Sequence, residues 1–306
     1  MERLSVVIVN WNGKNDTVAC LRSLRKLNTQ GYDMRVYVID NGSTDDSVTV
    51  IRREYDWTTV IETGENLGFS GGTNVGIRRA LRDGALYIWL LNNDTIAHRD
   101  ALSLLTVFSD ARVGIAGSKI YFAPGKEYHH DRYTKSQRGK AIWYAGGLID
   151  WANMYASHRG VDAVDEGQFD VVMETPFITG CSMFVRREVF DAIGLLDERY
   201  YLYLEDVDFC LRAARHGFRM LFVPSSVIWH IGAGSSGGAG NPLHDYYITR
   251  NRLLIGSRYA PLRTKLALIR EAVRYVFGNS TVRRRAVLDA FFGRFGRRYE
   301  PRKFHR

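Results

Sequence analysis

The sequence predicts an α/β fold in which a mostly parallel central sheet is covered by helices on both faces. Three observations support this prediction. Short apolar runs rich in β-branched residues alternate with segments of helical periodicity over the first hundred residues, and the connections between them are short. The runs are also apolar at successive positions, which is typical of strands buried on both faces because crossover helices cover a parallel sheet on its two sides.

The first hundred residues supply four strand signals and three helix signals. The expected strands cover residues 4–10, 35–40, 59–63 and 86–91, and the expected helices cover 16–27, 46–55 and 73–82. Asp16 is placed to cap the first helix, and the turn at residues 41–45 bends the chain and caps the second helix. Residues 68–72 (GFSGG) are predicted to form a flexible loop because three of them are glycine.

The pattern is less regular after residue 100. A helix is expected at 100–109, a strand at 113–122, a polar loop at 124–140 and short strands near Gly146 and Val171. An apolar run at 177–185 predicts a strand, and helices are expected at 187–193 and after Glu205, the second ending at Gly217. Short strands at 220–224 and 227–230 precede a glycine- and serine-rich loop at 232–240.

Composition limits the class of protein. The 306 residues are 45% hydrophobic and 25% charged, which is typical of soluble globular proteins and excludes disordered and collagen-like chains. No apolar stretch reaches the roughly 18 residues of a spanning helix and the N-terminus lacks a signal-peptide core, so a cytoplasmic protein is expected. Cys20, Cys181 and Cys210 have no metal-binding spacing and are expected to be free core thiols.

The C-terminal tail carries the basic charge of the protein. Residues 258–306 contain fourteen Lys and Arg against three acidic residues, a net charge of +11 that leaves −2 for the rest of the chain. Two basic amphipathic helices are expected here, with apolar positions at Leu262, Leu266, Ile269, Val273 and Val276 and again at Val287, Phe291, Phe292 and Phe295. They suit an anionic membrane surface, while packing against the rest of the chain or against a second subunit in a homodimer is left open. No nucleic-acid-binding motif is present.

Polar side chains stand where the predicted strands end. They are Asn10 and Asn12 after the first strand, Asp40 after the second, Asn66 near the third, and Asn92, Asn93 and Asp94 after the fourth. Ligands of open parallel sheets bind outside these strand ends. Asp40 can accept hydrogen bonds from a base or a ribose, and Asp94 can ligate a cation that carries phosphates. Each residue alone is more often a turn former, but four strand ends on one rim predict a nucleotide pocket.

The glycine-rich segment 66–74 (NLGFSGGTN) is similar to a phosphate-binding loop in composition only. It lacks the Lys-Ser/Thr of a nucleoside-triphosphate loop and the spacing of a dinucleotide fingerprint. The segment therefore argues against a dehydrogenase and against an enzyme that hydrolyses nucleoside triphosphates.

Glu205, Asp206 and Asp208 form an acidic cluster at the start of a predicted helix. A surface cap that interacts with the helix dipole is the more common role of such a cluster. The alternative is a general base that takes a proton from an incoming hydroxyl, and helical spacing lets only one of Asp206 and Asp208 face a given site. His230 is likewise either an ordinary core histidine or the partner of Asp94 in a metal site.

Taken together, these segments resemble the inverting glycosyltransferases of family 2, which have a Rossmann-like GT-A fold. The matching stretches run in the family's order across residues 5–236, and they are VVIVNWNG, CLRSL, VIDNGSTDDS, NLGFSGGTNVGI, WLLNNDT, ITGCSMFVRREVFDAIGLLDERYYLYLEDVDFCLRAARHGF and VIWHIGAGSS. The resemblance implies a GT-A domain at residues 1–256, with a nucleotide-binding half at 1–100 and an acceptor half at 101–256, followed by the basic tail at 257–306.

The resemblance also implies a role for each matching residue. The nucleotide sugar would lie against Asn10, Asn12, Asp40, Asn66, Gly72, Asn93 and Asp94, with Asp40 on the base. Asn93 and Asp94 stand where the family keeps its metal-binding Asp-x-Asp motif, and His230 would help to hold a Mg²⁺ or Mn²⁺ ion. Asp206 matches the catalytic base. Contacts to the acceptor are expected from Trp143, Glu205 and Arg250.

One departure from the family pattern affects the expected donor. Asn92 replaces the usual first aspartate, so cation binding should be weaker. The Asn-Asn-Asp form resembles the rhamnosyltransferase-like branch and favours a deoxythymidine-diphosphate rhamnose (dTDP-rhamnose) donor, with a UDP-hexose or UDP-galactofuranose as alternatives. The acceptor would be a glycan or polyprenyl-linked hydroxyl at the cytoplasmic face of the membrane, and the loop at 232–240 would close over the donor.

Two other functions compete with this interpretation. A nucleotidyltransferase on a similar sheet would require a basic, glycine-rich loop directly after the first strand, where this chain has only Asn-Trp-Asn-Gly-Lys. A non-catalytic glycan- or nucleic-acid-binding module would have no need of Asp94 and Asp206.

Overall fold

The computed structural model describes residues 1–29, 31–232 and 241–300, so the expected closure of the loop at 232–240 lies outside the described residues. Within them, one ten-stranded sheet has the order β10-β12-β6-β11-β4-β1-β2-β3, with β5 paired to β12 and β7 paired to β6. Its strands are β1 (Glu2–Asn10), β2 (Tyr32–Asp40), β3 (Thr58–Glu62), β4 (Tyr87–Leu91), β5 (Thr95–Ala97), β6 (Val113–Phe122), β7 (Ile142–Tyr144), β10 (Met173–Glu174), β11 (Ser182–Arg186) and β12 (Arg219–His230).

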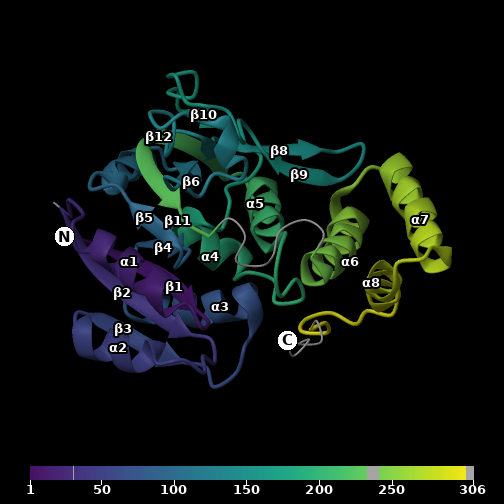
Figure 1. Cartoon of the computed structure of the whole chain (residues 1–306), viewed down its shortest axis with the longest axis horizontal. Coiled ribbons are helices and arrows are strands. Elements are labelled where there is room, and N and C mark those ends of the chain that lie inside the picture. The colour runs from purple at the N-terminus through teal and green to yellow at the C-terminus, as the bar shows by residue number, and fades with distance from the viewer. Residues whose placement is uncertain (30, 233–240, 301–306) are drawn as a thin grey trace.

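Helices α1–α5 lie around this sheet, whereas α6, α7 and α8 lie together to one side of it, with the small hairpin extending toward them (Figure 1). The helices are α1 (Lys14–Leu24), α2 (Ser47–Glu54), α3 (Gly68–Arg82), α4 (Arg187–Ile193), α5 (Glu205–Arg215), α6 (Pro242–Tyr259), α7 (Leu262–Phe277) and α8 (Thr281–Phe291), with 3₁₀ segments η1 (Ala101–Ser109) and η2 (His130–Arg132). Strands β8 (Gly147–Asp150) and β9 (Tyr155–His158) form the separate hairpin.

Helices cover the first strands from both sides, as predicted. Successive side chains of a strand point to opposite faces. Thr17 of α1 bonds to Asn10 of β1, whereas Gly72 and Gly76 of α3 lie against Val9 and Val7 of the same strand. Helices α1 and α3 therefore lie on opposite faces of the sheet.

The sheet is mostly parallel and runs without a break from the N-terminal half into the second half. Strands β4, β1, β2 and β3 are parallel to one another, and β12 is parallel to β6. Strand β11 is antiparallel to both β4 and β6, and it joins the two parallel groups. The polar residues at the ends of β1, β2 and β4 consequently share one edge with His230, the last residue of β12.

The predicted flexible loop at 68–72 is wrong, because these residues form the first turns of α3. The amide of Leu67 donates to Asn41 Oδ1 and that of Gly68 donates to Asn66 Oδ1, so side-chain amides satisfy donors at the start of the helix. The glycines serve close packing. A Cβ atom on Gly76 would stand 2.3 Å from Cγ1 of Val7.

Other boundaries also differ from the prediction. Asp16 does not cap α1, whose N-cap residue is Gly13. Residues 101–109 are 3₁₀ rather than α-helical. The two strands expected at 220–224 and 227–230 are one strand, β12, with a register shift between Val223 and Val227. Helix α6 was not predicted, because it buries polar residues such as Arg250 among apolar ones and so lacks a simple apolar stripe.

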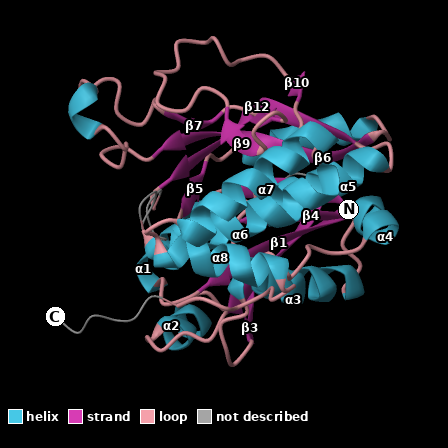
Figure 2. Ribbon diagram, turned by 90° about the vertical axis from the view of Figure 1, so that its right-hand side faces the viewer, coloured by secondary structure: helices cyan, strands magenta, loops and turns pink. Residues whose placement is uncertain are grey.

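The two basic tail helices are present as α7 and α8. Figure 2 shows them beside α6, and contacts join all three. No helix in the described part of the chain is both long and apolar enough to span a bilayer. Cys20, Cys181 and Cys210 are buried and free, as expected.

Candidate active site

A chain of hydrogen bonds links the ends of β1, β2 and β4. Asn93 Nδ2 donates to Thr17 Oγ1 at 2.9 Å, and that hydroxyl donates to Asn10 Oδ1 at 2.7 Å. Asn10 Nδ2 then donates to Asp40 Oδ2 at 2.9 Å. The remaining oxygen of Asp40 accepts the amide of Ser43 at 2.9 Å. The structure thus brings together three predicted residues from different strands and orients their polar atoms against one another.

Asn12 holds the turn that follows β2. Its backbone has a φ of +52°, in the left-handed region that asparagine tolerates better than most residues. Its Oδ1 accepts the amides of Thr44 and Asp45 at 2.7 and 3.2 Å. Asn12 is exposed, so the turn and the end of β1 form one surface at the rim of the sheet.

Asn66 and Gly72 are tied to this rim through the start of α3. Asn41 Nδ2 donates to Asn66 Oδ1 and to the carbonyl of Gly68, at 3.1 and 3.0 Å. Gly72 is buried, and a Cβ there would stand 3.1 Å from Val9 and 3.2 Å from Asn41. Both residues therefore help to hold α3 against the ends of β1 and β2.

Asp94 and His230 lie next to each other, as predicted. Strand β5, which follows Asp94, pairs with β12 and places Thr95 opposite His230. His230 Nε2 lies 3.2 Å from Asp94 Oδ1, and both side chains are 6% exposed. His230 Nδ1 is buried and has no hydrogen-bond partner among the described residues. The ring of Trp143 packs on His230 with centroids 4.5 Å apart, which places this expected acceptor residue beside the pair.

The Asp94 and His230 pair fits a divalent cation that takes its other ligands from a bound molecule. Mg²⁺ in particular is commonly held by one or two carboxylates together with substrate phosphates. Burial, and then the charge of Asp94, raise the pKa of Asp16, so a third carboxyl lies near the pair. The described residues nevertheless contain no group of three acidic, His or Cys side chains placed to hold a metal by themselves.

Glu205 and Asp206 begin α5 and are not a surface cap. Asp206 remains partly exposed, and its Oδ2 accepts the amide of Gly180 at 2.9 Å. Glu205 is 5% exposed, and its Oε2 has no partner among the described residues. Burial raises the pKa of both carboxyls, and the charge of Asp206 raises that of Glu205 further. Backbone amides at Gly180 and Val207 oppose the shift at Asp206, which favours Glu205 as the protonated member of the pair.

Residues 180 and 181 connect Asp206 to the end of β4. The amide of Gly180 binds Asp206, while the next carbonyl, that of Cys181, accepts the amide of Asn92 at 3.0 Å. After burial, the charges of Asp94 and Asp206 both contribute to the raised pKa of Cys181. Asp206 and Asp94 therefore lie on the same side of the molecule.

The loop that leads into α5 is strained. Tyr201, Tyr203 and Leu204 have φ values of +63°, +70° and +69°, which are unfavourable for residues with a Cβ. Asn251 Nδ2 donates to the carbonyls of Leu202 and Tyr203, both at 2.8 Å. The carbonyl of Tyr201 also accepts the amide of Phe69 in α3. The start of the Asp206 helix is thus held from two other helices.

The expected acceptor contact of Arg250 is wrong. Arg250 is 0% exposed, so it cannot reach a bound acceptor in this structure. Its Nη2 donates to the carbonyls of Arg199 and Tyr200 at 2.9 and 2.8 Å, and its Nη1 donates to that of Gly296 at 2.7 Å. Arg250 instead ties the strained loop and the tail to α6.

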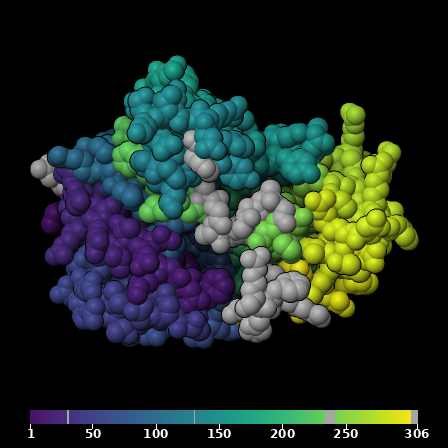
Figure 3. All heavy atoms as spheres, in the orientation of Figure 1, coloured from purple at the N-terminus to yellow at the C-terminus, as the bar shows by residue number. Residues whose placement is uncertain are grey.

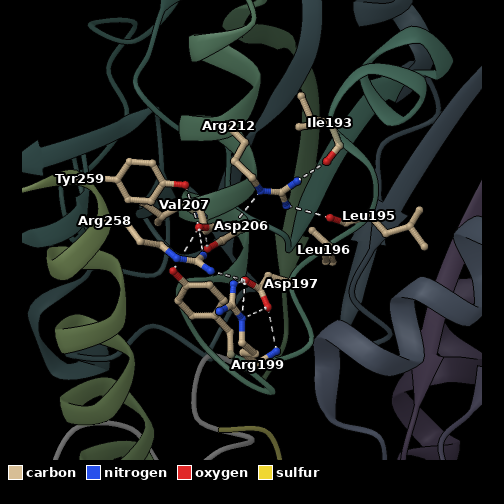
Figure 4. A network of polar contacts seen from close by, with 12 residues as sticks. Ile193, Leu195, Leu196, Asp197, Arg199, Asp206, Val207, Arg212, Arg258 and Tyr259 are labelled. Atoms are coloured by element: carbon tan, nitrogen blue, oxygen red, sulfur yellow. Dashed lines mark hydrogen bonds and ion pairs between the residues drawn. The ribbon is translucent and has the colours of Figure 1, made fainter. Parts of the chain in front are cut away.

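Asp208 points away from Asp206 and joins α5 to α6, as the helical spacing predicts. Its side chain is 0% exposed and lies 2.9 Å from Arg212 and 2.8 Å from Arg258. The hydroxyl of Tyr259 donates to it at 2.9 Å. Figure 4 shows this network, in which Arg258 also reaches Asp197. The network fixes the helix that carries Asp206.

Four residues that complete the site were missed. They are Thr17, Asn41, Gly180 and Asn251. Thr17, Asn41 and Asn251 are at most 2% exposed, and a polar residue in a segment that must be buried was the only signal available for them. Gly180 contributes only its backbone amide, so its residue type gives no sign that it belongs to the site.

A glycine behind Asp94 offers a direct test of the metal pair. A Cβ on Gly232 would stand 2.4 Å from Asp94 Oδ2, and the amide of the adjacent Ile231 already donates to the Asp94 carbonyl at 2.7 Å. We expect Gly232→Ala to displace the Asp94 carboxylate and to weaken Mn²⁺ binding at least tenfold. Mutation of residues that position metal ligands typically lowers metal affinity by about 10- to 100-fold. Isothermal titration with Mn²⁺ and donor measures it. The control is Gly125→Ala, where the added Cβ meets no atom within 4 Å but the φ of +77° is unfavourable for alanine, so it reports the effect of backbone strain away from the site. Equal Mn²⁺ affinity in the two variants would show that the Asp94 carboxylate is not a ligand.

The chain is similar in sequence to a known family and to proteins of known activity. Residues 2–252 match the family model described as glycosyltransferase-like family 2. The N-acetylglucosaminyl-diphospho-decaprenol L-rhamnosyltransferase of Mycobacterium tuberculosis is 28% identical over 216 residues, 66% of this chain and 68% of that protein. The dTDP-rhamnosyl transferase RfbF of Shigella flexneri is 25% identical over 284 residues, 87% of this chain and 83% of that protein.

A solved structure shares the fold. The crystal structure of GalNAc-T7 with UDP, GalNAc and Mn²⁺ is similar to this chain with a TM-score of 0.61 and 18% identity, and the match covers 88% of this chain and 54% of that one. The predicted GT-A fold is thereby confirmed. The family match decides against the nucleotidyltransferase and against the non-catalytic binding module.

Proposed function

The chain belongs to glycosyltransferase-like family 2 and is a glycosyltransferase, and on this premise we propose that it moves a deoxyhexose from a nucleoside-diphosphate donor to a hydroxyl of a lipid-linked glycan. The observation that carries the proposal is the continuous set of contacts from Asp40 to Asp206. It runs through Asn10, Thr17 and Asn93 to the end of β4, and from there through residues 180 and 181.

The donor is dTDP-rhamnose. Two relatives of this chain are named rhamnosyltransferases, which supports this sugar over a UDP-hexose or UDP-galactofuranose. Asp40 receives the nucleotide base, since each carboxylate oxygen keeps a lone pair beyond its bond to Asn10 or Ser43. Asn12 and Asn93 border the sugar diphosphate at the ends of β1 and β4.

The reaction is a single displacement at the anomeric carbon. Asp206 takes the proton of the acceptor hydroxyl as its oxygen attacks the anomeric carbon, and the bond to the diphosphate breaks on the opposite face. The sugar configuration inverts. Partial exposure of Asp206 leaves it open to an acceptor, and the amides of Gly180 and Val207 stabilise its charged form.

A divalent cation is held by Asp94 and His230. When bound, Mg²⁺ or Mn²⁺ neutralises charge that develops on the departing nucleoside diphosphate. The chain's own contribution is to hold the two ligands 3.2 Å apart beneath Trp143 in a site that is nearly closed to water.

The acceptor is linked to a membrane lipid. A relative acts, by its name, on a diphospho-decaprenol glycan, which supports a reaction at a membrane surface. Trp143 is partly exposed and is proposed to contact the acceptor, whereas Glu205 is only 5% exposed and would be reached only if the loop before α5 moved. The protein itself is peripheral: the nucleotide sugar comes from solution, and only the acceptor hydroxyl comes from the membrane surface.

Purified protein with a panel of nucleotide sugars and Mn²⁺ or Mg²⁺ tests the function. We expect dTDP-rhamnose to raise the melting temperature in a metal-dependent way and to be hydrolysed slowly. His230→Ala should remove the metal dependence, whereas His98→Ala, which replaces a histidine outside the site, should leave it unchanged. Stabilisation by UDP-sugars alone would overturn the donor, and no stabilisation by any nucleotide sugar would overturn the function.

A further inference from the structure

Helix α7 presents a continuous apolar stripe to solvent. Five side chains are 51–83% exposed, at spacings of three or four residues that place them on one side of the helix: Leu262, Leu266, Ile269, Val273 and Phe277. The opposite side is anchored. Thr264 donates to the Trp151 carbonyl, and Leu268 is buried against Gly256. Packing of the stripe onto the rest of the chain, which the sequence left open, does not occur among the described residues.

The end of α8 carries two further exposed apolar side chains. Phe291 and Phe292 are 84% and 65% exposed. Helices α7 and α8 contact each other, and in Figure 3 the atoms of the tail build the end of the molecule away from the N-terminal half. Large exposed apolar patches on otherwise polar proteins mark surfaces that meet a partner or a membrane.

The charge on this surface is positive because its acids face inward. Glu271 accepts from Arg252 and from Tyr275. Asp289 is 6% exposed and accepts the hydroxyl of Tyr246 at 2.6 Å. The basic side chains of the same helices are exposed or half-buried, and they are Arg263, Lys265, Arg270, Arg274, Arg283, Arg284 and Arg285.

A basic pocket lies between α8 and the segment that follows it. Its volume is about 410 Å³, and it is lined by Thr281, Arg284, Arg285, Leu288, Asp289, Arg294 and Arg298. Four guanidinium groups surround one carboxylate, that of Asp289, which accepts the hydroxyl of Tyr246 and lies 3.7 Å from Arg285 and 3.8 Å from Arg294, so three positive charges remain in excess. Guanidinium groups match phosphate oxygens in geometry as well as charge. Leu288, 38% exposed, gives the same pocket an apolar edge.

We propose that α7 and α8 form a docking face for anionic phospholipids, with lipid phosphates in the arginine pocket and the apolar stripe at the level of the acyl chains. Basic amphipathic helices lie in bilayers in this way. A second copy of the chain would bring two positive faces together, and a nucleic acid would leave the apolar stripe in water. The inference rests on the proposed function only in that a lipid-linked acceptor gives the docking its purpose.

Sedimentation of the full chain with vesicles tests the docking face. We expect binding to phosphatidylcholine vesicles that contain phosphatidylglycerol and little binding to phosphatidylcholine alone. Because each basic residue near an anionic surface contributes about 1 kcal/mol, the triple change Arg284→Gln, Arg285→Gln and Arg294→Gln should weaken binding by about a hundredfold. Leu266→Gln with Ile269→Gln should also weaken it.

The matched control removes the same charge elsewhere. Arg52, Arg53 and Arg78 have side chains that are 54%, 68% and 53% exposed, and their replacement by Gln should leave vesicle binding within twofold. Donor hydrolysis should be unchanged in all three variants, which separates this proposal from the proposed function. Equal loss in the control, equal binding to neutral vesicles, or a dimer that Leu266→Gln dissociates would overturn the docking face.

Discussion

Replacement of Asp206 by asparagine is expected to slow sugar transfer by about a thousandfold, within the range that a general base contributes. Asparagine keeps the size of the side chain and can still accept the amide of Gly180, which lies 2.9 Å from Asp206 Oδ2. The capacity to take a proton is lost, together with one hydrogen bond, because the single amide oxygen of asparagine can accept only one of the two amides, Gly180 and Val207, that the carboxylate binds. Initial rates with dTDP-rhamnose and a lipid-linked acceptor measure the effect.

The control is Asp191→Asn, which removes an exposed carboxylate from helix α4. Donor affinity should be equal in the two variants, since Asp206 acts on the acceptor. The wild-type rate should also fall as the pH is lowered through the raised pKa of Asp206, because burial favours its inactive protonated form. Full transfer by Asp206→Asn would identify another residue as the base.

Asp208→Asn is expected to lower the free energy of unfolding by about 3 kcal/mol, as removal of one partner from a buried ion pair does. The carboxylate is wholly buried, and two arginines share it at 2.9 and 2.8 Å. Asparagine leaves the guanidinium groups of Arg212 and Arg258 without the charge between them. Equilibrium unfolding in urea measures the change.

Asp191→Asn is again the matched control. Asp191 forms an i, i+4 pair with Arg187 at 3.4 Å, but its side chain is 58% exposed, so its loss should cost under about 1 kcal/mol. Equal unfolding midpoints for Asp208→Asn and Asp191→Asn would show that the network in Figure 4 does not hold α5 to α6.

Local patterns predicted most of the fold. Continuous apolar runs located β1, β2 and β4, and the buried polar residues at their ends marked the rim of the site. Predictions from local sequence patterns were wrong where tertiary packing decides the local structure. Residues 68–72 contain three glycines and look flexible in the sequence, yet they are helical. Asn66 accepts the amide of Gly68, Asn41 donates to its carbonyl, and the sheet lies too close to Gly72 for a larger side chain.

Only part of the candidate site could be predicted from the sequence, again because contacts between distant residues decide the rest. Asp94, His230 and Asp206 were found because their chemistry is distinctive. Arg250 was misassigned because an arginine in sequence carries no sign of whether carbonyl oxygens or solvent will surround it. In the structure Arg250 donates to the carbonyls of Arg199 and Tyr200, at the start of the strained loop fifty residues earlier in the chain.

The sequence alone determined the class of fold, the order of its main strands along the chain and the amphipathic character of the tail. These follow from residue type and from periods of two and 3.6, which are local properties. The tertiary structure alone decided which of those side chains meet, which carboxylates are buried, and that the stripe on α7 faces outward. These depend on contacts between residues far apart in the chain, and on the water those contacts exclude.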